Sequence, residues 1–494
     1  MKSKKGLSLI MLVIIIIVII ILAGAVILSL SKNNPINNAK EAKFKLTFKD
    51  YEHELTLWLT NEYAITNGAL DIPTVNATKD SGTYTKDSNI LKLKDIITII
   101  KPEHEDMLEI KEGKLVYTGT DVEEIEWLQE VGISINGAIV PIEIASSDMH
   151  TAALMSDGTV KTWGYNGDGR FGTGTMDDSY TPITIPNLTN VKQIEAGYGF
   201  MLALMDNGTV KAWGDNWAGQ LGDGTNEYRT TPVTVVGLTD VIQISAGGGS
   251  SPIALLNDGT VKTWGYNGDG ELGDGTILNR NSPVSPIGLS NVKQVAGGSD
   301  HTLALLNDGS VKVWGANWYG QFGNTTFVNS KTPIDIPNLA NVKQIQSAPN
   351  YSLALMDDGK VKAWGCNWNA NLGDGTMNDS NIPIYVTDLE NVKEISAGST
   401  HAVALLNDGT VKVWGSNNFG ELGDGTMDYK YTPAALSTLT NVKKIIAGSQ
   451  ITFAIMNDGT ANGWGFNGYG HLGDGTTVFY RLNPTLIDMS YTGE

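Results

Sequence analysis

The sequence of 494 residues contains very little cysteine, since Cys366 is the single one. One cysteine excludes an intrachain disulfide and a cysteine-based zinc site, so the fold must be stabilised by packing and hydrogen bonds. Positive charge is also scarce, because 34 Lys and Arg residues stand against 53 Asp and Glu residues and give a formal charge of −19. That balance argues against nucleic acid as the main partner, because such binding depends on clustered Lys and Arg.

Charge is missing altogether from one stretch near the N-terminus. Leu7 to Leu30 contains only apolar and small residues, and three lysines lie before it in residues 1–6. A helix of about 20 residues crosses a bilayer. The lysines predict that the N-terminus lies inside and that residues 31–494 lie outside the cell membrane.

Three interpretations of this segment remain open. A cleaved signal peptide is consistent with Ala23-Gly24-Ala25, although the apolar run continues past it. A plain signal anchor explains the lysines and the span. The abrupt junction of Gly6 and Leu7 resembles the cleavage and methylation segment of type IV pilins and pseudopilins. That resemblance implies cleavage after Gly6 and methylation of Leu7. The family usually has Glu where this chain has Met11, which favours a minor or tip subunit that contacts other pilin-like subunits.

An amphipathic helix is predicted after the span. Phe44, Phe48, Tyr51, Leu55 and Trp58 recur at spacings of three and four residues, which places them on one helix face. The resemblance to pilins implies one continuous helix over residues 7–63, with 1–6 as the leader. A separate juxtamembrane stalk is the alternative, because Pro35 lies among asparagines that favour a break.

Residues 64–139 have a different texture and predict a small α+β spacer. Residues 107–110 and 114–117 are short alternating segments around a turn with Gly113, which is typical of a β-hairpin. Thr120 and Glu123 form a capping-box pattern, so a short helix is expected over 121–131. The texture of the segment also resembles the heads of Gram-positive pilin-like proteins.

From residue 140 to residue 489 the sequence repeats itself seven times, and residues 490–494 form a tail. The mark of each unit is a Trp-Gly pair at a spacing of 50 or 51 residues. The repeated tryptophans, which we expect in the core, are Trp163, Trp213, Trp264, Trp314, Trp364, Trp414 and Trp464.

The second unit shows how each repeat is built. Val191 to Ile194 and Phe200 to Met205 are runs of strand length, and Asn207-Gly208 is a tight-turn signal before the returning strand that ends at Trp213. A glycine-rich loop follows, and a fourth strand is expected near Pro232. Four short strands in each of seven units predict a mainly β fold, a seven-bladed β-propeller.

The repeat resembles a known family at its most specific positions. Residues 296–305 (AGGSDHTLAL), 308–311 (DGSV) and 320–323 (GQFG), together with Trp314-Gly315, are similar to the regulator-of-chromosome-condensation repeat. That resemblance implies a closed ring of seven blades. We expect the ring to be sealed by pairing of the terminal strand near Pro484 to Ile487 with the first strand near Val140 to Ile144, which would remove both sheet edges.

The repeats offer little chemistry. His150, His301 and His401 share one repeat position, but other units have Phe200 or Ile451 there, so packing or hydrogen bonding is expected rather than metal binding. The Asp-Gly-Thr triplets lack the ligand spacing of calcium loops and indicate turns. No nucleophile motif or phosphate loop is present. We therefore expect no metal, no cofactor and no enzyme activity, unless a pocket lies on the propeller axis.

Function is better sought where the units differ, in the loops after each Trp-Gly pair. Aromatic residues on loops carried by a rigid scaffold are typical of protein or glycan interfaces. Simple packing of these rings onto the blades is the alternative. The candidate binding residues are Trp217, Trp318, Tyr319, Trp368 and Phe419.

Together these patterns predict a membrane-inserted, pilin-like surface protein that displays a propeller to bind an extracellular protein or glycan. A signal-anchored propeller that binds or inhibits a partner protein, as a secreted β-lactamase inhibitor with a similar repeat does, is the alternative. The exchange-factor or chromatin role of eukaryotic members is a third hypothesis, against which the anchor and the negative charge argue.

Overall fold

The computed structural model describes residues 139–489 without a break. Of the preceding part it describes residues 43, 45–47, 49–51, 55, 76–77, 82–83, 100–101, 107–111, 114–117 and 134–135. The chain divides into two compact units, one of residues 1–119 and 123–138 and one of residues 120–122 and 139–494.

The first unit contains one five-stranded sheet in the order β2-β1-β3-β4-β5. Its strands are β1 (Asn76–Ala77), β2 (Gly82–Thr83), β3 (Leu108–Lys111), β4 (Lys114–Tyr117) and β5 (Ser134–Ile135). The antiparallel pairing of β3 with β4, from Leu108 opposite Tyr117 to Lys111 opposite Lys114, confirms the predicted hairpin.

The described residues between 43 and 55 are helical, as the amphipathic pattern predicts. Tyr51 and Leu55 are buried, and the Tyr51 hydroxyl accepts a hydrogen bond of 3.0 Å from the Lys101 amide. The predicted span with its Gly6/Leu7 junction and the predicted helix at 121–131 lie outside the described residues. Within the described part of the chain, no helix is both long enough and apolar enough to cross a bilayer.

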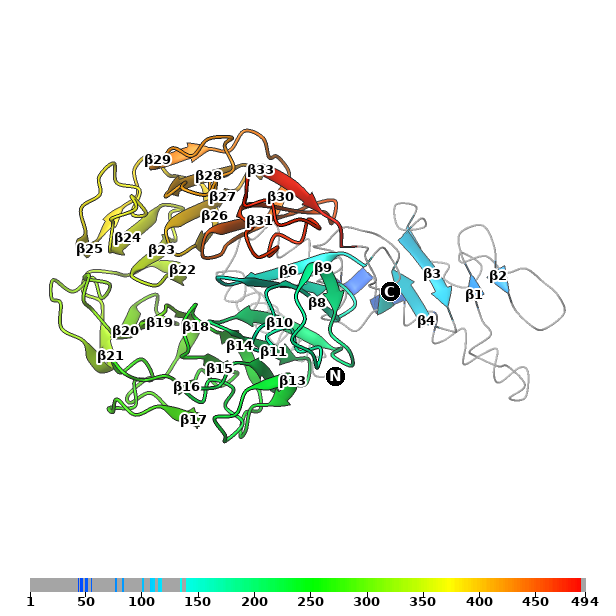
Figure 1. Ribbon diagram of the computed structural model, residues 1–494, viewed down its shortest axis with the longest axis horizontal. Helices are drawn as coiled ribbons and strands as arrows, with labels where there is room; N and C mark the ends of the chain where they lie inside the picture. Colours follow the sequence, from blue (N-terminus) through cyan, green and yellow to red (C-terminus); the bar gives the residue numbers. More distant parts are fainter. Residues whose placement is uncertain are drawn as a thin grey trace, which may run out of the picture. The chain divides into compact units, whose positions relative to one another are not determined.

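The second unit confirms the predicted mainly β, seven-bladed propeller (Figure 1). Each blade is a four-stranded antiparallel sheet made by one contiguous segment of chain. Blade 1 contains β6 (Pro141–Ser146), β7 (His150–Met155), β8 (Val160–Gly164) and β9 (Ser179–Thr184). Blade 2 contains β10 (Val191–Ala196), β11 (Phe200–Met205), β12 (Val210–Gly214) and β13 (Arg229–Thr234). Blade 3 contains β14 (Val241–Ser245), β15 (Ile253–Leu256), β16 (Val261–Gly265) and β17 (Arg280–Val284).

The remaining four blades repeat this order. Blade 4 contains β18 (Val292–Gly297), β19 (His301–Leu306), β20 (Val311–Gly315) and β21 (Ser330–Asp335). Blade 5 contains β22 (Val342–Ser347), β23 (Tyr351–Met356), β24 (Val361–Gly365) and β25 (Ser380–Tyr385). Blade 6 contains β26 (Val392–Ala397), β27 (His401–Leu406), β28 (Val411–Gly415) and β29 (Lys430–Ala435). Blade 7 contains β30 (Val442–Ala447), β31 (Ile451–Met456), β32 (Ala461–Phe466) and β33 (Tyr480–Ile487).

The burial of each strand follows its place in the blade. The second strand is the most buried, and in β11 residues 200–204 are all buried because both faces of the sheet are covered by neighbouring blades. The fourth strand is the most exposed, as in β13. Pro232 lies in this outer strand, where the lack of an amide proton breaks no ladder bond to a further strand.

The predicted pairing of the terminal strand with the first strand is wrong. β6 is the first strand of blade 1 and pairs with β7, whereas β33 is the fourth strand of blade 7 and pairs with β32. The repeat as read from the sequence is already a complete blade, so no strand has to be exchanged. The ring closes instead through contacts between blades, of the same kind between blades 7 and 1 as elsewhere.

The principal contact between blades is made by the repeated tryptophans. All seven are fully buried, and each indole Nε1 donates to a backbone carbonyl in the loop of the preceding blade at 2.7–3.0 Å. Between blades 7 and 1, Trp163 donates to His471 at 2.9 Å. A Cβ on Gly473 would stand 2.6 Å from Trp163 Nε1, so this close approach requires glycine. We call these seven contacts the tryptophan layer.

Glutamines join the innermost strands around the axis. Gln193 of blade 2 accepts a hydrogen bond from the Ile244 amide and donates one to the Ile244 carbonyl, both at 2.9 Å. Its side-chain amide therefore bonds both backbone groups of Ile244, as the backbone of a neighbouring strand would. Gln243, Gln294 and Gln344 repeat the arrangement. The same position is charged in the three blades around the closure, where it holds Glu394, Lys444 and Glu143.

Candidate functional site

The candidate site lies at one end of the blades, where long loops join the third and fourth strands. Phe200 at the start of β11 pairs with Gly214 at the end of β12, so the short loop before Phe200 and the long loop after Gly214 share this end. We call it the loop face. It comprises the long loops 165–178, 215–228, 266–279, 316–329, 366–379, 416–429 and 466–479, and the short loops 147–149, 197–199, 246–252, 298–300, 348–350, 398–400 and 448–450.

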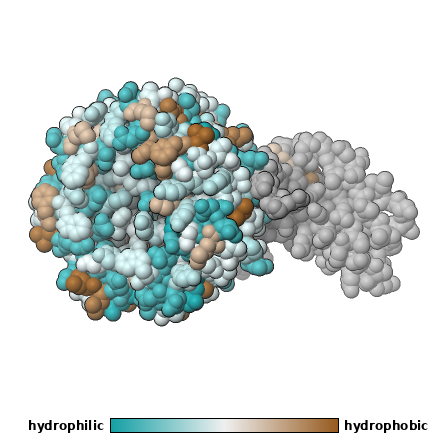
Figure 2. Space-filling view, viewed as in Figure 1, coloured by the Kyte–Doolittle hydropathy of each residue, from teal (hydrophilic) through white to brown (hydrophobic). Residues whose placement is uncertain are grey.

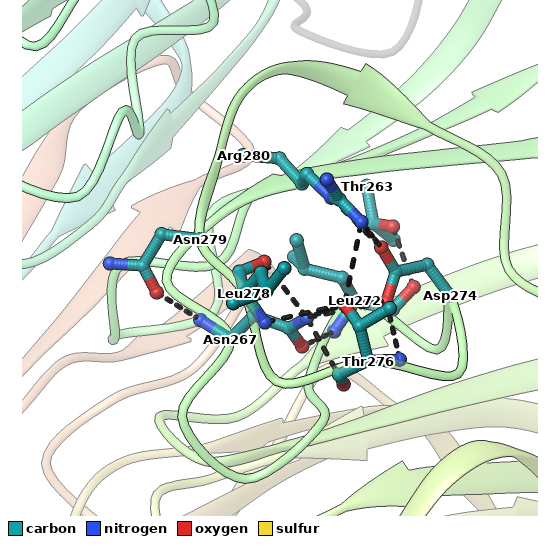
Figure 3. A network of polar contacts seen from close by, with 8 residues as sticks. All are labelled: Thr263, Asn267, Leu272, Asp274, Thr276, Leu278, Asn279 and Arg280. Atoms are coloured by element: carbon teal, nitrogen blue, oxygen red, sulfur yellow. Dashed lines mark hydrogen bonds and ion pairs between the residues drawn. The ribbon is translucent and has the colours of Figure 1, made fainter.

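One buried asparagine organises each long loop, as the loop of blade 3 shows (Figure 3). The Asn267 side-chain amide donates to the carbonyls of Thr276 and Leu278 at 3.3 and 3.1 Å, and its carbonyl accepts from the Leu272 amide at 3.0 Å. Leu272 is thereby turned into the core. The Asp274 carboxylate accepts a hydrogen bond from the Thr276 amide and is ion-paired with Arg280 at 2.8 Å. The loop is therefore tied at both ends and in the middle.

The same asparagine occurs in all seven units, as Asn166, Asn216, Asn267, Asn317, Asn367, Asn417 and Asn467. Each of them is fully buried. These asparagines were not among the predicted site residues, although the sequence contains their signal: a polar residue repeated without exception inside an otherwise variable loop. Their role makes the loops rigid supports for the residues that follow them.

The three predicted loop tryptophans project from these supports. Trp217, Trp318 and Trp368 have exposed fractions of 55%, 52% and 59%. They are also partly packed, because Trp217 lies 5.5 Å from Tyr266 and Trp368 lies 5.1 Å from Tyr319, measured between ring centroids. The packing interpretation therefore applies in part to Trp217 and Trp368, and all three rings are accessible to solvent.

Phe419 behaves differently from the tryptophans. Its ring centroid lies 5.1 Å from that of Phe466 and 6.3 Å from that of Phe479, and the side chain is half-buried. This cluster lies between blades 6 and 7. Tyr319 is likewise half-buried against Trp368. Phe419 and Tyr319 thus support the exposed rings more than they extend the exposed area.

Other hydrophobic residues are exposed on the variable parts of the long loops. They are Met176, Tyr228, Ile277, Leu278, Phe327, Val328, Met377, Met427, Val478 and Phe479. Figure 2 shows one face of the ring, where hydrophobic residues gather in separate patches on a largely hydrophilic surface.

Acidic residues dominate the loop face. Arg170 is the single Lys or Arg in all of its loops, each of which the structure describes. Lys and Arg residues at the start of the outer strands neutralise four of the carboxylates, in the pairs Asp223–Arg229, Asp274–Arg280, Asp424–Lys430 and Asp474–Arg481. The acidic residues of the face are Asp148, Asp168, Asp177, Asp178, Asp215, Asp223, Glu227, Asp269, Glu271, Asp274, Asp300, Asp374, Asp379, Glu421, Asp424, Asp428 and Asp474.

A pocket of about 370 Å³ opens on the loop face at blade 1. Tyr165, Tyr198 and Tyr469 line it, with Asp148, Asp168 and Arg170 among the remaining residues. The Arg170 guanidinium is ion-paired with Asp168 and lies 5.1 Å from the centroid of the Tyr165 ring. We call this the three-tyrosine pocket.

A second cavity, of about 280 Å³, lies on the propeller axis. Its lining includes Glu143, Glu195 and Lys444 from the innermost strands. Burial, and after it the charge of Glu143, raise the pKa of Glu195 to about 8, so this carboxyl is largely protonated at neutral pH. The strands that line this cavity also join the blades through the glutamine pairs. The cavity is therefore the space that the ring of innermost strands encloses.

The histidines and the Asp-Gly-Thr triplets take part in local structure. His301 and His401 are buried, and their Nε2 atoms hydrogen-bond Ser352 and Thr452 of the next blade at 2.9 and 2.8 Å. Burial lowers the pKa of both imidazoles to about 3, so they are neutral. In the turns, Asp258 accepts from the amide and hydroxyl of Thr260. No group of three or more His, Cys, Asp or Glu side chains among the described residues is arranged to hold a metal ion.

Comparison with known proteins points in one direction. The model of the RCC1-like domain matches residues 118–390, and two models of the regulator of chromosome condensation (RCC1) repeat match residues 392–421 and 408–455. The human and mouse E3 ubiquitin-protein ligases HERC2 are 30% identical to the chain over 163 residues, which are 32% of this chain. The matched segment spans only 3% of the length of those ligases.

Solved structures share the fold. A chain in the crystal structure of Kap60 bound to yeast RCC1 (Prp20) superposes with a TM-score of 0.61 at 25% identity, over 67% of this chain and 83% of that one. Human WBSCR16 gives a TM-score of 0.61 at 25% identity, over 67% and 94% of the two chains. Prp20p from Saccharomyces cerevisiae gives a TM-score of 0.60 at 24% identity, over 71% and 88%.

Proposed function

The chain belongs to the family of RCC1-like domains, and from this premise we propose that it is a non-catalytic binding protein whose loop face recognises an extracellular protein or glycan. The observation that carries the proposal is the exposure of Trp217, Trp318 and Trp368 on loops that buried asparagines hold rigid. Rigid exposed tryptophans are the usual centres of binding energy at interfaces, because little conformational freedom is lost when they are covered.

The loop variation supports recognition of a partner over a purely structural role for this face. The scaffold residues repeat in every unit, whereas the residues beside each tryptophan change from unit to unit: Asp215 and Ala218, for example, correspond to Ala316 and Tyr319. A fold that needed these positions for its own packing would repeat them as it repeats Asn216 and Asn317. Recognition by several different loops gives specificity through their combination.

Photo-crosslinking in cells that make the protein tests this function. Trp318 is replaced by p-benzoylphenylalanine, and Tyr385, which is 55% exposed on the outer strand β25 away from the loops, is replaced in the same way as the control. A crosslinked adduct is expected from the loop position and not from the control position. The triple variant Trp217→Ala, Trp318→Ala and Trp368→Ala should abolish the partner's binding without unfolding the propeller. Equal crosslinking at both positions would show that the loop face has no special role.

The proposal includes display of the propeller outside the cell by a membrane-inserted, pilin-like N-terminus. It is supported by the uncharged run from Leu7 to Leu30 after three lysines and by the abrupt Gly6/Leu7 junction. The alternative is a signal anchor that is never cleaved. Intact mass of the membrane-extracted protein separates the two: loss of residues 1–6 with one added methyl group supports the pilin-like assignment, and an uncut N-terminus rules it out.

A further inference from the structure

The chemistry of the loop face points to a particular class of partner. Resting on the proposed function, we infer that the partner is a protein with an exposed Lys- or Arg-rich segment, and that the three-tyrosine pocket takes one cationic side chain of that segment. The inference follows from the charge of the whole face, the walls of the pocket and the space that Gly199 leaves in it.

The first step is charge complementarity. Arg170 is the only Lys or Arg in the loops, and it is already ion-paired with Asp168. The acidic side chains therefore exceed the basic ones around the whole face, even after the four pairs with the outer strands. A surface of one sign attracts partners of the other sign and accelerates their association. The same surface repels nucleic acids and sulfated or sialylated glycans.

The second step is the aromatic wall of the pocket. Tyr198 and Tyr469 are 52% and 40% exposed, and the Tyr469 ring lies 6.1 Å from Tyr165 between centroids. A cation over the face of an aromatic ring is attracted by the negative charge of that face. The pocket already contains one example, since the Arg170 guanidinium occupies this position over Tyr165. A second cationic side chain is accommodated by the same chemistry on the exposed rings.

The third step concerns Gly199, which leaves space in the pocket because it has no side chain. Gly199 lines the pocket with a φ of +77°, and a Cβ there would stand 3.2 Å from the Asp215 Cβ and 3.8 Å from Asp168 Oδ2. Glycine thus leaves space beside two carboxylates. Burial raises the pKa of Asp215, and the nearby charge of Asp168 adds a smaller contribution in the same direction. Because Asp168 already balances Arg170, Asp148 is the carboxylate of the pocket lining that meets an incoming cation.

The other blades do not combine these features. The residues corresponding to Tyr165 are Asp215, Tyr266, Ala316, Cys366, Ser416 and Phe466, and those corresponding to Tyr469 are Asp168, Ala218, Asp269, Tyr319, Asn369 and Phe419. Three tyrosines and two aspartates line one pocket only where blades 7, 1 and 2 meet. The tryptophans on blades 2, 4 and 5 then extend the contact to the rest of the partner.

Small probes of defined charge test the pocket. N-acetyl-arginine amide, N-acetyl-lysine amide, N-acetyl-glutamine amide and N-acetylglucosamine are titrated against the full-length protein and followed by saturation-transfer NMR. The two cationic probes should bind, and the neutral amide should not. Tyr198→Ala and Asp148→Asn should each weaken cation binding by about fivefold or more. Tyr385→Ala and Asp335→Asn, at exposed positions outside the loops, are the matched controls and should leave it unchanged.

The outcomes are distinct. Equal affinity for the glutamine amide, or unchanged affinity in Tyr198→Ala and Asp148→Asn, would overturn the inference. Binding of N-acetylglucosamine in place of the cations would assign the pocket to a glycan. If crosslinks still form at position 318 in those cases, the proposed function stands and only the partner class is wrong. If the cations bind the pocket but no crosslinks form, the pocket stands and the binding role of the tryptophan loops fails.

Discussion

The tryptophan layer and the loop face use the same amino acid for opposite purposes. In the layer, Trp314 is fully buried and its indole nitrogen donates to the Glu271 carbonyl of the preceding blade at 2.7 Å. On the loop face, Trp318 follows it by four residues and is 52% exposed. The intervening Asn317 turns the chain between the two environments. The repeated residues build the ring, whereas the residues between them have no such structural role and are the ones that we propose for recognition.

Replacing one tryptophan from each region should break this comparison most clearly. Trp314→Ala removes a large buried side chain and leaves the Glu271 carbonyl with only the longer hydrogen bond from the Thr302 hydroxyl, so we expect a loss of about 3–5 kcal/mol in the free energy of unfolding. Trp318→Ala removes a half-exposed ring and should cost about 0.5–1 kcal/mol. Chemical denaturation followed by fluorescence measures both. Comparable losses in the two variants would mean that the loop tryptophans also stabilise the ring.

The buried asparagines offer a second, somewhat smaller effect. Asn367→Ala leaves the Leu372 amide and the Thr376 carbonyl without their side-chain partners, and we expect a loss of about 2–4 kcal/mol in the free energy of unfolding. Asn378→Ala, at an exposed position in the same loop, is the matched control and should change stability by less than about 0.5 kcal/mol. Hydrogen exchange of the Leu372 amide should rise only in the first variant. Unchanged exchange there would contradict the assigned role of Asn367.

A pH series should show a gradual effect, spread over several pH units, and concerns the inner strands. The folded-state pKa of Glu195, about 8, lies above its ordinary value of 4.5. Between these two values the unfolded chain has lost the proton that the folded chain keeps, so stability falls as pH rises, by at most about 1.4 kcal/mol per pH unit, and levels off above pH 8.

Glu195→Gln should remove this slope. Glutamine already occupies the corresponding position of blade 5 as Gln346, which lines the same cavity on the propeller axis, so the substitution introduces no new kind of side chain there. The melting temperature of the variant and the wild type, measured from pH 5 to pH 9, gives the comparison. Parallel curves for the two proteins would show that Glu195 does not govern this part of the pH dependence.

Much of the fold could be predicted because the sequence signals for each strand and turn recur in all seven units. The four strands of the second unit were placed correctly, since alternation and Asn207-Gly208 are local signals. The closure of the ring was not, because the Trp163 contact with His471 joins residues 308 positions apart and leaves no local mark. The predicted pairing of the terminal and first strands rested on the general tendency of proteins to cover sheet edges, but each repeat already forms a complete four-stranded blade.

The candidate site could be predicted only in part for the same reason. Variable aromatics in loops identified Trp217, Trp318 and Trp368, whose exposure the structure shows. The three-tyrosine pocket could not be found, because Tyr165, Tyr198 and Tyr469 come from three different units and meet only when the ring is closed. The sequence showed the negative total charge of the chain, but it did not show that the acidic residues gather on the loop face.

The contiguous blades have a consequence for biosynthesis. Each blade holds all four of its strands within about 50 residues, so it can fold while the ribosome is still making the next one. Trp163 of blade 1 nevertheless waits for His471, which is synthesised 308 residues later. Until then the nascent protein is an open arc with an apolar flank at each end. A chain that stops anywhere before blade 7 keeps both apolar flanks exposed. Chaperones and proteases can recognise these flanks even when every blade that has been made is complete.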